Sequence, residues 1–339
     1  MKILQIVNPV LPFPATTVGG TERIVQYLTD ELVMKGHEVT LMGHDHSIVS
    51  EGVKFIGVGT YLDRSKTIKT IWKHLLFNKY DVIHNHGRLI HFLPSVWTGT
   101  RKVHTFHMAE LESEAFHRFS NLNPRNFTFS PCSEWIQRRY TNLSGHWNYV
   151  HNGLPENLYT FDKKKLSSES PLLIICRLAE SKGVLDAIKI ALMSNRKLII
   201  AGAVGDYPHE KRWFNEVLAP LCDGIHIRFI GAVNDAQKNE LLNNAAALLI
   251  PTVDSEAFNT TMLEANACGC PVISYNRFCF TEFIIDGVNG YKGETIQDLI
   301  GAVNKIDAIS RHQCRQIFED KYTAGIMTEN YLTLYKQKA

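Results

Sequence analysis

The stretch SEAFNTTMLEANACGCPVI, residues 255–273, has the pattern of a helix followed directly by a buried strand. Asn259 is a good N-cap for a helix over about 260–268, and Gly269 suits the position past its end. The proline two residues later cannot continue the helix, and the apolar run after it predicts a strand. The free backbone N–H groups at about 260–262 would form an anion site suited to a diphosphate.

The same alternation of short apolar runs with amphipathic segments continues along the whole chain and is typical of β-α-β units around a parallel sheet. The segments of the first half that predict strands are KILQIVN, HEVTLMG, VKFIGVG, YDVIH, RKVHTF, FTFSP and WNYVHN. The helix after the first strand is expected from about Thr21, whose hydroxyl can cap it, to Gly36. In the second half, strands are predicted at PLLIIC, RKLIIAG, IHIRFIG, ALLIP and CPVISY.

A polar segment that ends in proline, TFDKKKLSSESP at residues 160–171, separates the two halves and has the composition of a linker. The pattern therefore predicts an α/β protein with two Rossmann-like, doubly wound domains that face a cleft. The first domain is expected over residues 1–160 and the second over 161–322. A helix is expected in the last segment, 323–339.

The composition agrees with two folded domains, because 339 residues with 45% hydrophobic content are more than one typical core absorbs. The formal net charge of +2 gives no reason to expect a nucleic-acid partner. Seven cysteines without C-x-x-C pairs indicate free thiols in a reducing compartment. No run approaches the roughly 18 apolar residues of a membrane span, and the N-terminus lacks the length of a signal region. We expect a cytoplasmic protein.

Two glutamates in the opening stretch are eight positions apart, Glu256 before the predicted helix and Glu264 inside it. Glu264 stands where a carboxylate can accept hydrogen bonds from the two hydroxyls of a ribose. Glu256 would face the group on the other side of the phosphates. The same spacing also fits two surface glutamates on a solvated loop and helix.

A second motif, CRLAESKG at residues 176–183, places Arg177 at the end of a strand and Lys182 directly before a helix. Loops at the carboxyl ends of parallel strands are where such sheets bind ligands. A guanidinium and an ammonium could together neutralise a diphosphate leaving group. The alternative is that both are ordinary exposed basic residues of a loop.

Taken together, these motifs resemble the GT-B glycosyltransferases of family 4, the retaining group that transfers sugars from nucleotide-sugar donors. EAFNTTMLEANACGCPVI resembles the family's Glu-x7-Glu motif, CRLAESKG its Arg-x4-Lys-Gly motif, and VHNGLPENLYTF its connection between domains. Their order and spacing match over nearly the whole chain. One departure is Ala257-Phe258-Asn259, where members of the family usually have Gly-Phe-Gly.

The resemblance implies a donor domain in the second half, an acceptor side in the first, and a C-terminal helix, 323–339, that packs back on the first domain. The donor-binding residues that it implies are Arg177, Lys182, Asn259, Thr260, Thr261 and Glu264, with Glu256 near the hydroxyls of the transferred sugar. In the first half, Gly19 and Gly20 of VGGTE resemble the family's glycine loop, where backbone can approach donor phosphate or acceptor. His107, at the end of HTFH, resembles the residue that sits against the transferred sugar.

Two further histidines, His84 and His86 of DVIHNHG, fall at another predicted strand end and could line the acceptor side. The competing interpretation is a zinc site that includes His104 or His107, although no further ligand can be identified.

The implied reaction is transfer of a hexosyl group, with retention at the anomeric carbon, to a hydroxyl of a glycan, a lipid-linked acceptor or a small molecule. His107, Glu256, Arg177 and Lys182 would be the catalytic residues, with no metal required. A UDP-sugar is favoured over a GDP-sugar as co-substrate. Electrostatic stabilisation of the leaving diphosphate would be the largest catalytic contribution.

Other functions remain open at this point. A nucleotide-sugar epimerase or a phosphorylase can share the fold, and a non-catalytic nucleotide-sugar binding subunit would keep the same pocket. A dehydrogenase fits less well, because no G-x-G-x-x-G follows the first strand. Residues 64–80 are basic and amphipathic at helical spacing, so they could contact the inner face of a membrane or pack as an ordinary domain helix.

Overall fold

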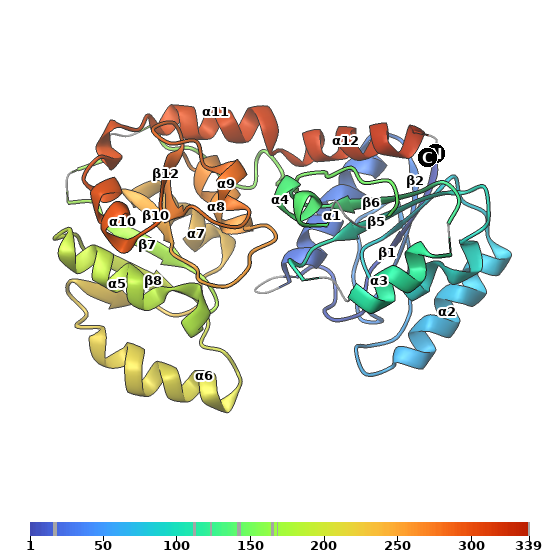
Figure 1. Ribbon diagram of the computed structural model, residues 1–339, viewed down its shortest axis with the longest axis horizontal. Coiled ribbons are helices and arrows are strands. Elements are labelled where there is room, and N and C mark those ends of the chain that lie inside the picture. Colours follow the sequence, from blue (N-terminus) through green and yellow to red (C-terminus); the bar gives the residue numbers. More distant parts are fainter. Residues whose placement is uncertain are drawn as a thin grey trace. The chain divides into compact units, whose positions relative to one another are not determined.

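The computed structural model of the protein describes residues 1–15, 19–110, 113–122, 124–140, 144–163, 166–167 and 169–337. The chain forms two units: unit 1 comprises Met1–Pro155 and Thr323–Ala339, and unit 2 comprises Glu156–Tyr322. Each unit contains one six-stranded sheet with helices packed on it (Figure 1). The segment predicted as a linker, 160–171, belongs to unit 2, and its residues 164, 165 and 168 lie outside the described residues.

The sheet of unit 1 has the strand order β3-β2-β1-β4-β5-β6, and every pair in it is parallel. Its strands are β1 (Lys2–Ile6), β2 (Glu38–Gly43), β3 (Val53–Gly57), β4 (Val82–Asn85), β5 (Arg101–Phe106) and β6 (Phe127–Pro131). The strands β1, β4, β5 and β6 are buried along nearly their whole length, as a parallel sheet covered by helices requires, whereas the edge strand β3 is only partly buried. The order in which successive strands are added to the sheet reverses between β1 and β4. Such a switch point leaves a crevice at the carboxyl edge of the sheet.

The helices of unit 1 include segments from both ends of the chain. They are α1 (Gly20–Met34), α2 (Arg64–Phe77), the 3-10 helix η1 (Leu89–Ser95), α3 (Ser113–Ser120), α4 (Glu134–Arg139) and α12 (Ala324–Lys336). The last helix, drawn in red in Figure 1, packs beside α1 and on β5. Ile71 of α2 is fully buried, so the apolar face of this helix packs into the core of unit 1.

Two predictions for the first half were wrong in detail. The helix α1 begins one residue earlier than expected, because Gly19, with a φ of 105°, serves as its N-cap, and no side chain caps it. The predicted strand at 147–152 makes only an isolated bridge to β6, between Trp147 and Phe129. The backbone N–H groups of Asn148 and Val150 still donate to the carbonyls of Phe129 and Pro131, so the segment lies along β6 without forming a regular strand.

The sheet of unit 2 repeats the same topology, with the order β12-β11-β10-β7-β8-β9 and only parallel pairs. Its strands are β7 (Leu172–Ile175), β8 (Leu198–Ala201), β9 (Ile227–Phe229), β10 (Ala247–Ile250), β11 (Val272–Tyr275) and β12 (Gly290–Gly293). The sequence gives no apolar run at β12, whose glycines allow close approach to its neighbour: a Cβ at Gly290 would lie 2.0 Å from the carbonyl oxygen of Val272. The switch point here lies between β7 and β10.

The helices of unit 2 cover both faces of that sheet. They are η2 (Glu180–Lys182), α5 (Val184–Met193), α6 (Pro208–Trp213), the π-helical turn η3 (Phe214–Leu218), η4 (Ala219–Leu221), α7 (Asp235–Asn244), α8 (Thr260–Ala267), α9 (Phe280–Phe283), α10 (Ile296–Val303), η5 (Ile306–Ala308) and α11 (Arg311–Lys321). Within the described parts of the chain, none of the helices has the length and apolar character needed to cross a bilayer. All seven cysteines are free thiols.

Candidate functional site

The start of α8 lies directly after the loop that follows β10, at the carboxyl edge of the sheet of unit 2. As predicted, Asn259 caps the helix, and its side-chain oxygen accepts a hydrogen bond of 3.1 Å from the N–H of Met262. That N–H is therefore not free for a ligand, in contrast to the expectation. The N–H groups of Thr260 and Thr261 have no partner within the helix and remain as donors at its positive end.

The loops that follow β7 and β10 meet in front of this helix start. Lys182, from the first loop, forms an ion pair with Glu256, from the second. Backbone contacts hold the two loops together, since the carbonyl of Ser181 accepts hydrogen bonds from both the N–H of Val253 and the hydroxyl of Thr252. The two motifs that stand 74 positions apart in the sequence thus form one site at the switch point of unit 2.

Gly183 permits this close contact between the loops. Its φ is 71°, and a Cβ at this position would lie 1.9 Å from the carbonyl oxygen of Pro251 at the end of β10. Any other residue would therefore combine backbone strain with a steric clash. The glycine of the CRLAESKG motif is required by the packing of the two loops.

Arg177, at the end of β7, forms an ion pair with Glu210 of α6. The side chain of Glu210 is 7% exposed, while that of Arg177 is 52% exposed. A Cβ at Gly205, in the loop after β8, would lie 1.9 Å from the Glu210 carboxylate. The absence of a side chain at Gly205 therefore leaves space for this carboxylate. The pair leaves much of the guanidinium open to an anionic ligand.

Glu264 is buried on the inner side of α8, with 4% of its side chain exposed. Its Oε1 accepts a hydrogen bond of 2.7 Å from Nζ of Lys238, which also lies 3.0 Å from a carboxylate oxygen of Asp235. Its Oε2 has no hydrogen-bond partner among the residues that the structure describes. One carboxylate oxygen is thus occupied and oriented by a lysine, and the other is left as an acceptor.

In unit 1, Gly19 and Gly20 form the turn into α1, and Val18 of the same motif lies outside the described residues. A Cβ at Gly20 would meet no atom within 4 Å, so the backbone there borders open space. Glu22, in the first turn of α1, is 6% exposed, and its burial raises the pKa of its carboxyl group. This acid is part of VGGTE, but the sequence interpretation assigned it no role.

His107 follows β5 and is held by a chain of buried hydrogen bonds. Its Nε2 lies 2.9 Å from Nδ1 of His86, and Nε2 of His86 lies 2.8 Å from the side-chain oxygen of Gln5. Because that oxygen can only accept, His86 donates from Nε2 and accepts from His107. Burial lowers the pKa of His107 to about 4, so the ring is neutral near pH 7. His107 thus donates from Nε2 and keeps an unprotonated Nδ1.

His84 takes a different place from the one predicted. It is fully buried, with Nδ1 2.6 Å from the hydroxyl of Tyr335 and Nε2 2.7 Å from that of Thr105. Both ring nitrogens are thus bonded inside unit 1, beneath α12, so His84 does not line an acceptor surface. His86 is also buried and acts behind His107. In the described part of the chain, no three His, Cys, Asp or Glu side chains are grouped so that they could hold a metal ion.

Several residues of the site could not be found from the sequence. Lys238, Glu210 and Gln5 each hold a predicted site residue in place. They come from distant segments of the chain and belong to ordinary helix or strand patterns, so no local signal marks them.

Two family models match the chain, one in each unit. "Glycosyltransferase Family 4" matches residues 18–147, and "Glycosyl transferases group 1" matches residues 159–317. Among curated relatives, an uncharacterized glycosyltransferase of Methanocaldococcus jannaschii is 26% identical over 337 residues, with 82% of each chain covered. A phosphatidyl-myo-inositol mannosyltransferase of Propionibacterium freudenreichii is 24% identical over 349 residues, covering 93% of this chain and 87% of the relative.

Solved structures share the fold. HepE of Anabaena, crystallised in complex with UDP, has a TM-score of 0.76 at 17% identity, with 98% of this chain and 99% of that chain covered. At this level of identity the likeness establishes the two-domain GT-B architecture and no more.

Proposed function

This chain belongs to the family 4 glycosyltransferases of the GT-B fold, and from that premise we propose that it moves a hexosyl group from a nucleotide-diphosphate sugar to an acceptor hydroxyl, with retention at the anomeric carbon. The observation that carries the proposal is the meeting of Lys182, Glu256 and the start of α8 at the switch point of unit 2. Cationic side chains and free amides at one sheet edge suit a diphosphate.

We assign the donor to unit 2. The N–H groups of Thr260 and Thr261 and the side chains of Arg177 and Lys182 would bind the diphosphate. Both cations already have carboxylate partners, so donor binding exchanges or shares these ion pairs and leaves no cation buried alone. The unpartnered Oε2 of Glu264 would accept from a ribose hydroxyl.

In the proposed reaction the bond between the anomeric carbon and the phosphate oxygen breaks, and the acceptor oxygen bonds to the same face of that carbon. The proton of the acceptor hydroxyl passes to the leaving phosphate. Arg177, Lys182 and the amides of α8 stabilise the negative charge that develops on the diphosphate, without a metal ion. We assign Glu256 to the sugar hydroxyls, and His107 to the transferred sugar as a neutral hydrogen-bonding group.

A UDP-sugar is the proposed donor. The support is the UDP complex of HepE, a protein that shares this fold. The proposed acceptor is a glycan, a lipid-linked glycan or a small molecule, and the setting is the cytoplasm.

The test is a calorimetric titration of the protein with UDP, GDP and ADP, followed by the conjugate sugars of the nucleotide that binds. We expect UDP to bind, and the Lys182→Ala variant to bind it at least about tenfold more weakly, since a charge-assisted hydrogen bond contributes about 1.5–3 kcal/mol. Lys189→Ala, an exposed lysine of the following helix, is the control. If no nucleotide binds, or if Lys182→Ala binds as the wild type does, the assignment of unit 2 fails.

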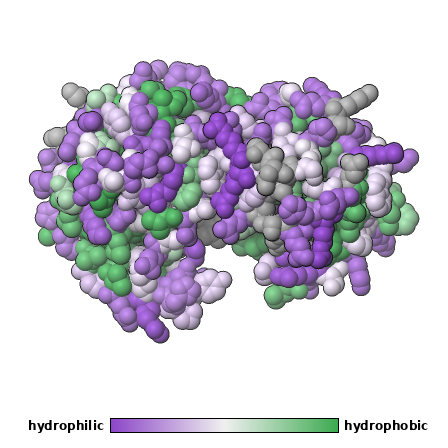
Figure 2. Space-filling view, in the orientation of Figure 1, coloured by the Kyte–Doolittle hydropathy of each residue, from purple (hydrophilic) through white to green (hydrophobic). Residues whose placement is uncertain are grey.

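Contact with a membrane surface is a separate proposal, which rests on α2. Leu76 and Phe77, at its end, are 67% and 79% exposed, Leu62, just before its start, is 88% exposed, and Lys69 and Lys73 are also exposed. Hydrophobic and hydrophilic side chains lie next to each other over this helix (Figure 2). Flotation with anionic vesicles should carry the wild type but less of a Leu76→Ser/Phe77→Ser variant; a wild type that stays in the aqueous fraction would contradict the proposal.

A further inference from the structure

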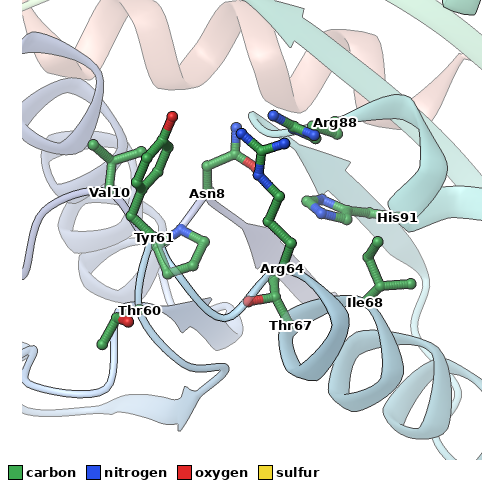
Figure 3. A pocket seen from close by; sticks show the side chains of 10 residues that line it. Asn8, Val10, Thr60, Tyr61, Arg64, Thr67, Ile68, Arg88 and His91 are labelled. Carbon is green, nitrogen blue, oxygen red and sulfur yellow. The ribbon is translucent and has the colours of Figure 1, made fainter.

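A pocket opens at the switch point of unit 1, between the loops that follow β1 and β4. The space among its lining residues, which is open to solvent, measures about 410 Å³. Its lining residues are Asn8, Pro9, Val10, Thr60, Tyr61, Arg64, Thr67, Ile68, Arg88 and His91 (Figure 3). The crevice at a switch point is where doubly wound sheets bind ligands, so the position alone favours a binding site.

Two arginines dominate the charge of this pocket. Arg64 is the first residue of α2, and Arg88 follows β4, and both side chains are exposed. In Figure 3 their guanidinium groups extend toward the same side of the pocket. Within the described ranges, neither arginine forms an ion pair, although a ring contact places Arg64 5.8 Å from the centre of Tyr61.

Two carboxylates of neighbouring segments, Asp63 and Asp45, have other partners. Oδ2 of Asp63 accepts a hydrogen bond of 2.9 Å from the hydroxyl of Thr60. Asp45 accepts from the backbone N–H of Gly59 and pairs with Lys66 at 3.0 Å. Among the described residues, neither carboxylate is paired with Arg64 or Arg88, so both guanidinium groups have donors to offer a ligand.

The backbone adds to the positive potential. The helix α2 starts at the pocket, and its first turn contains no acidic residue. Asp63, its N-cap, makes no side-chain cap, so the first N–H groups of the helix stay free. Among the described residues that line the pocket, none is acidic.

His91 gives the pocket a neutral polar wall. Its Nδ1 lies 3.3 Å from the side-chain oxygen of Asn85, and burial lowers its pKa to about 4. Gly87 lets the loop approach closely, because a Cβ there would lie 2.7 Å from the side-chain oxygen of Asn8 and 2.9 Å from the His91 ring. The polar groups of the wall are thus packed against one another.

We propose that this pocket binds a phosphate ester carried by the acceptor. The inference rests on the proposed function, because it names the acceptor class of that reaction. Two guanidinium groups from different loops can each offer two donors, which matches the several oxygens of a phosphate better than the two of a carboxylate. The pocket and His107 lie at the same edge of the same sheet, since they follow β1, β4 and β5. An anchored phosphate would hold the acceptor at that edge.

The test uses glycerol 3-phosphate and glycerol as paired probes in calorimetric titrations at constant ionic strength, with UDP at saturation to fill the phosphate site of unit 2. We expect saturable binding of glycerol 3-phosphate and none of glycerol. Arg64→Gln and Arg88→Gln should each weaken binding about tenfold or more, because each removes a charge-assisted contact. Arg125→Gln, an exposed arginine of unit 1 outside the pocket, should bind as the wild type does.

Three results would overturn the proposal: no saturable binding to the wild type, unchanged binding in both pocket variants, or an equal loss in Arg125→Gln. The UDP titration distinguishes failure of the pocket proposal from failure of the proposed function. If UDP does not bind, the proposed function fails. Titration of Arg177→Gln with glycerol 3-phosphate, in which a cation of the unit 2 site is removed, then still shows whether the pocket of unit 1 binds a phosphate ester.

The source of the phosphate is decided by vesicles. If the ester belongs to a phospholipid headgroup, vesicles of phosphatidylcholine with phosphatidylglycerol should compete with glycerol 3-phosphate for the wild type, and Arg88→Gln should bind neither the headgroup nor glycerol 3-phosphate at this pocket, even where α2 still holds the vesicle. If the ester belongs to a soluble acceptor, glycerol 3-phosphate should bind and the vesicles should not compete.

Discussion

Replacement of Glu264 by glutamine tests the donor site with little disturbance of the fold. The carboxylate is almost fully buried, with Oε1 bonded to Lys238 and Oε2 without a partner among the described residues. A glutamine oxygen can keep the hydrogen bond from Lys238, and Lys238 keeps its contact of 3.0 Å with Asp235. We therefore expect the free energy of unfolding to fall by only about 1 kcal/mol.

The effect on nucleotide binding should be larger. With the glutamine oxygen on Lys238, the amide NH2 group takes the place of Oε2 and cannot accept a hydrogen bond from a ribose hydroxyl. A hydrogen bond to a charged group contributes about 1.5–3 kcal/mol, and this contribution is lost. The loss corresponds to a UDP dissociation constant raised about 10- to 150-fold.

The assay is calorimetric titration of wild type and Glu264→Gln with UDP and with 2′,3′-dideoxyuridine diphosphate, which lacks both hydroxyls. If Glu264 contacts the ribose, the dideoxy compound should bind both proteins with similar, weak affinity. The substitution and the missing hydroxyls each remove the same hydrogen bond, so their effects on the binding free energy should not add. Glu240→Gln, an exposed residue of α7, should bind UDP as the wild type does. A folded Glu264→Gln protein that binds UDP with wild-type affinity would refute the ribose assignment.

The cap of α8, the glycine between the two loops and the buried histidines of unit 1 can each be tested by a measurement of stability. Asn259→Ala removes the cap of α8, so unit 2 should lose about 1 kcal/mol in urea unfolding and bind UDP more weakly; an unchanged unfolding midpoint would contradict the cap. Gly183→Ala should destabilise unit 2 by more than about 2 kcal/mol, because the new Cβ meets the Pro251 carbonyl at a positive φ; a wild-type melting temperature would show that the loop adjusts. Burial lowers the pKa of His91 and of His107 to about 4, from 6.5, so the unfolded chain binds more protons between these values. The stability of unit 1 that is present above pH 6.5 should therefore be lost as the pH falls toward 4, and a flat urea-unfolding profile from pH 7.5 to 4.5 would contradict this.

Much of unit 2 could be predicted from local sequence. Local sequence predicts the cap at Asn259, the end of the helix after Ala267 and the strand over Val272–Tyr275, because each depends on residues a few positions away. The strand at Gly290–Gly293 could not be predicted, because it is held by pairing with β11 and not by an apolar run of its own.

The sequence by itself predicted the order of most elements and the two domains, because periodicity and caps are local properties of the chain. Its motifs resemble those of the family, and they supplied the side chains that we propose for the donor site. Only the tertiary structure decided how those side chains are held. It paired Lys182 with Glu256 and Glu264 with Lys238, placed His84 beneath the C-terminal helix, and brought Arg64 and Arg88 to one pocket. Such contacts join residues that are far apart in the chain, and they arise because parallel strands place successive loops at one edge of a sheet.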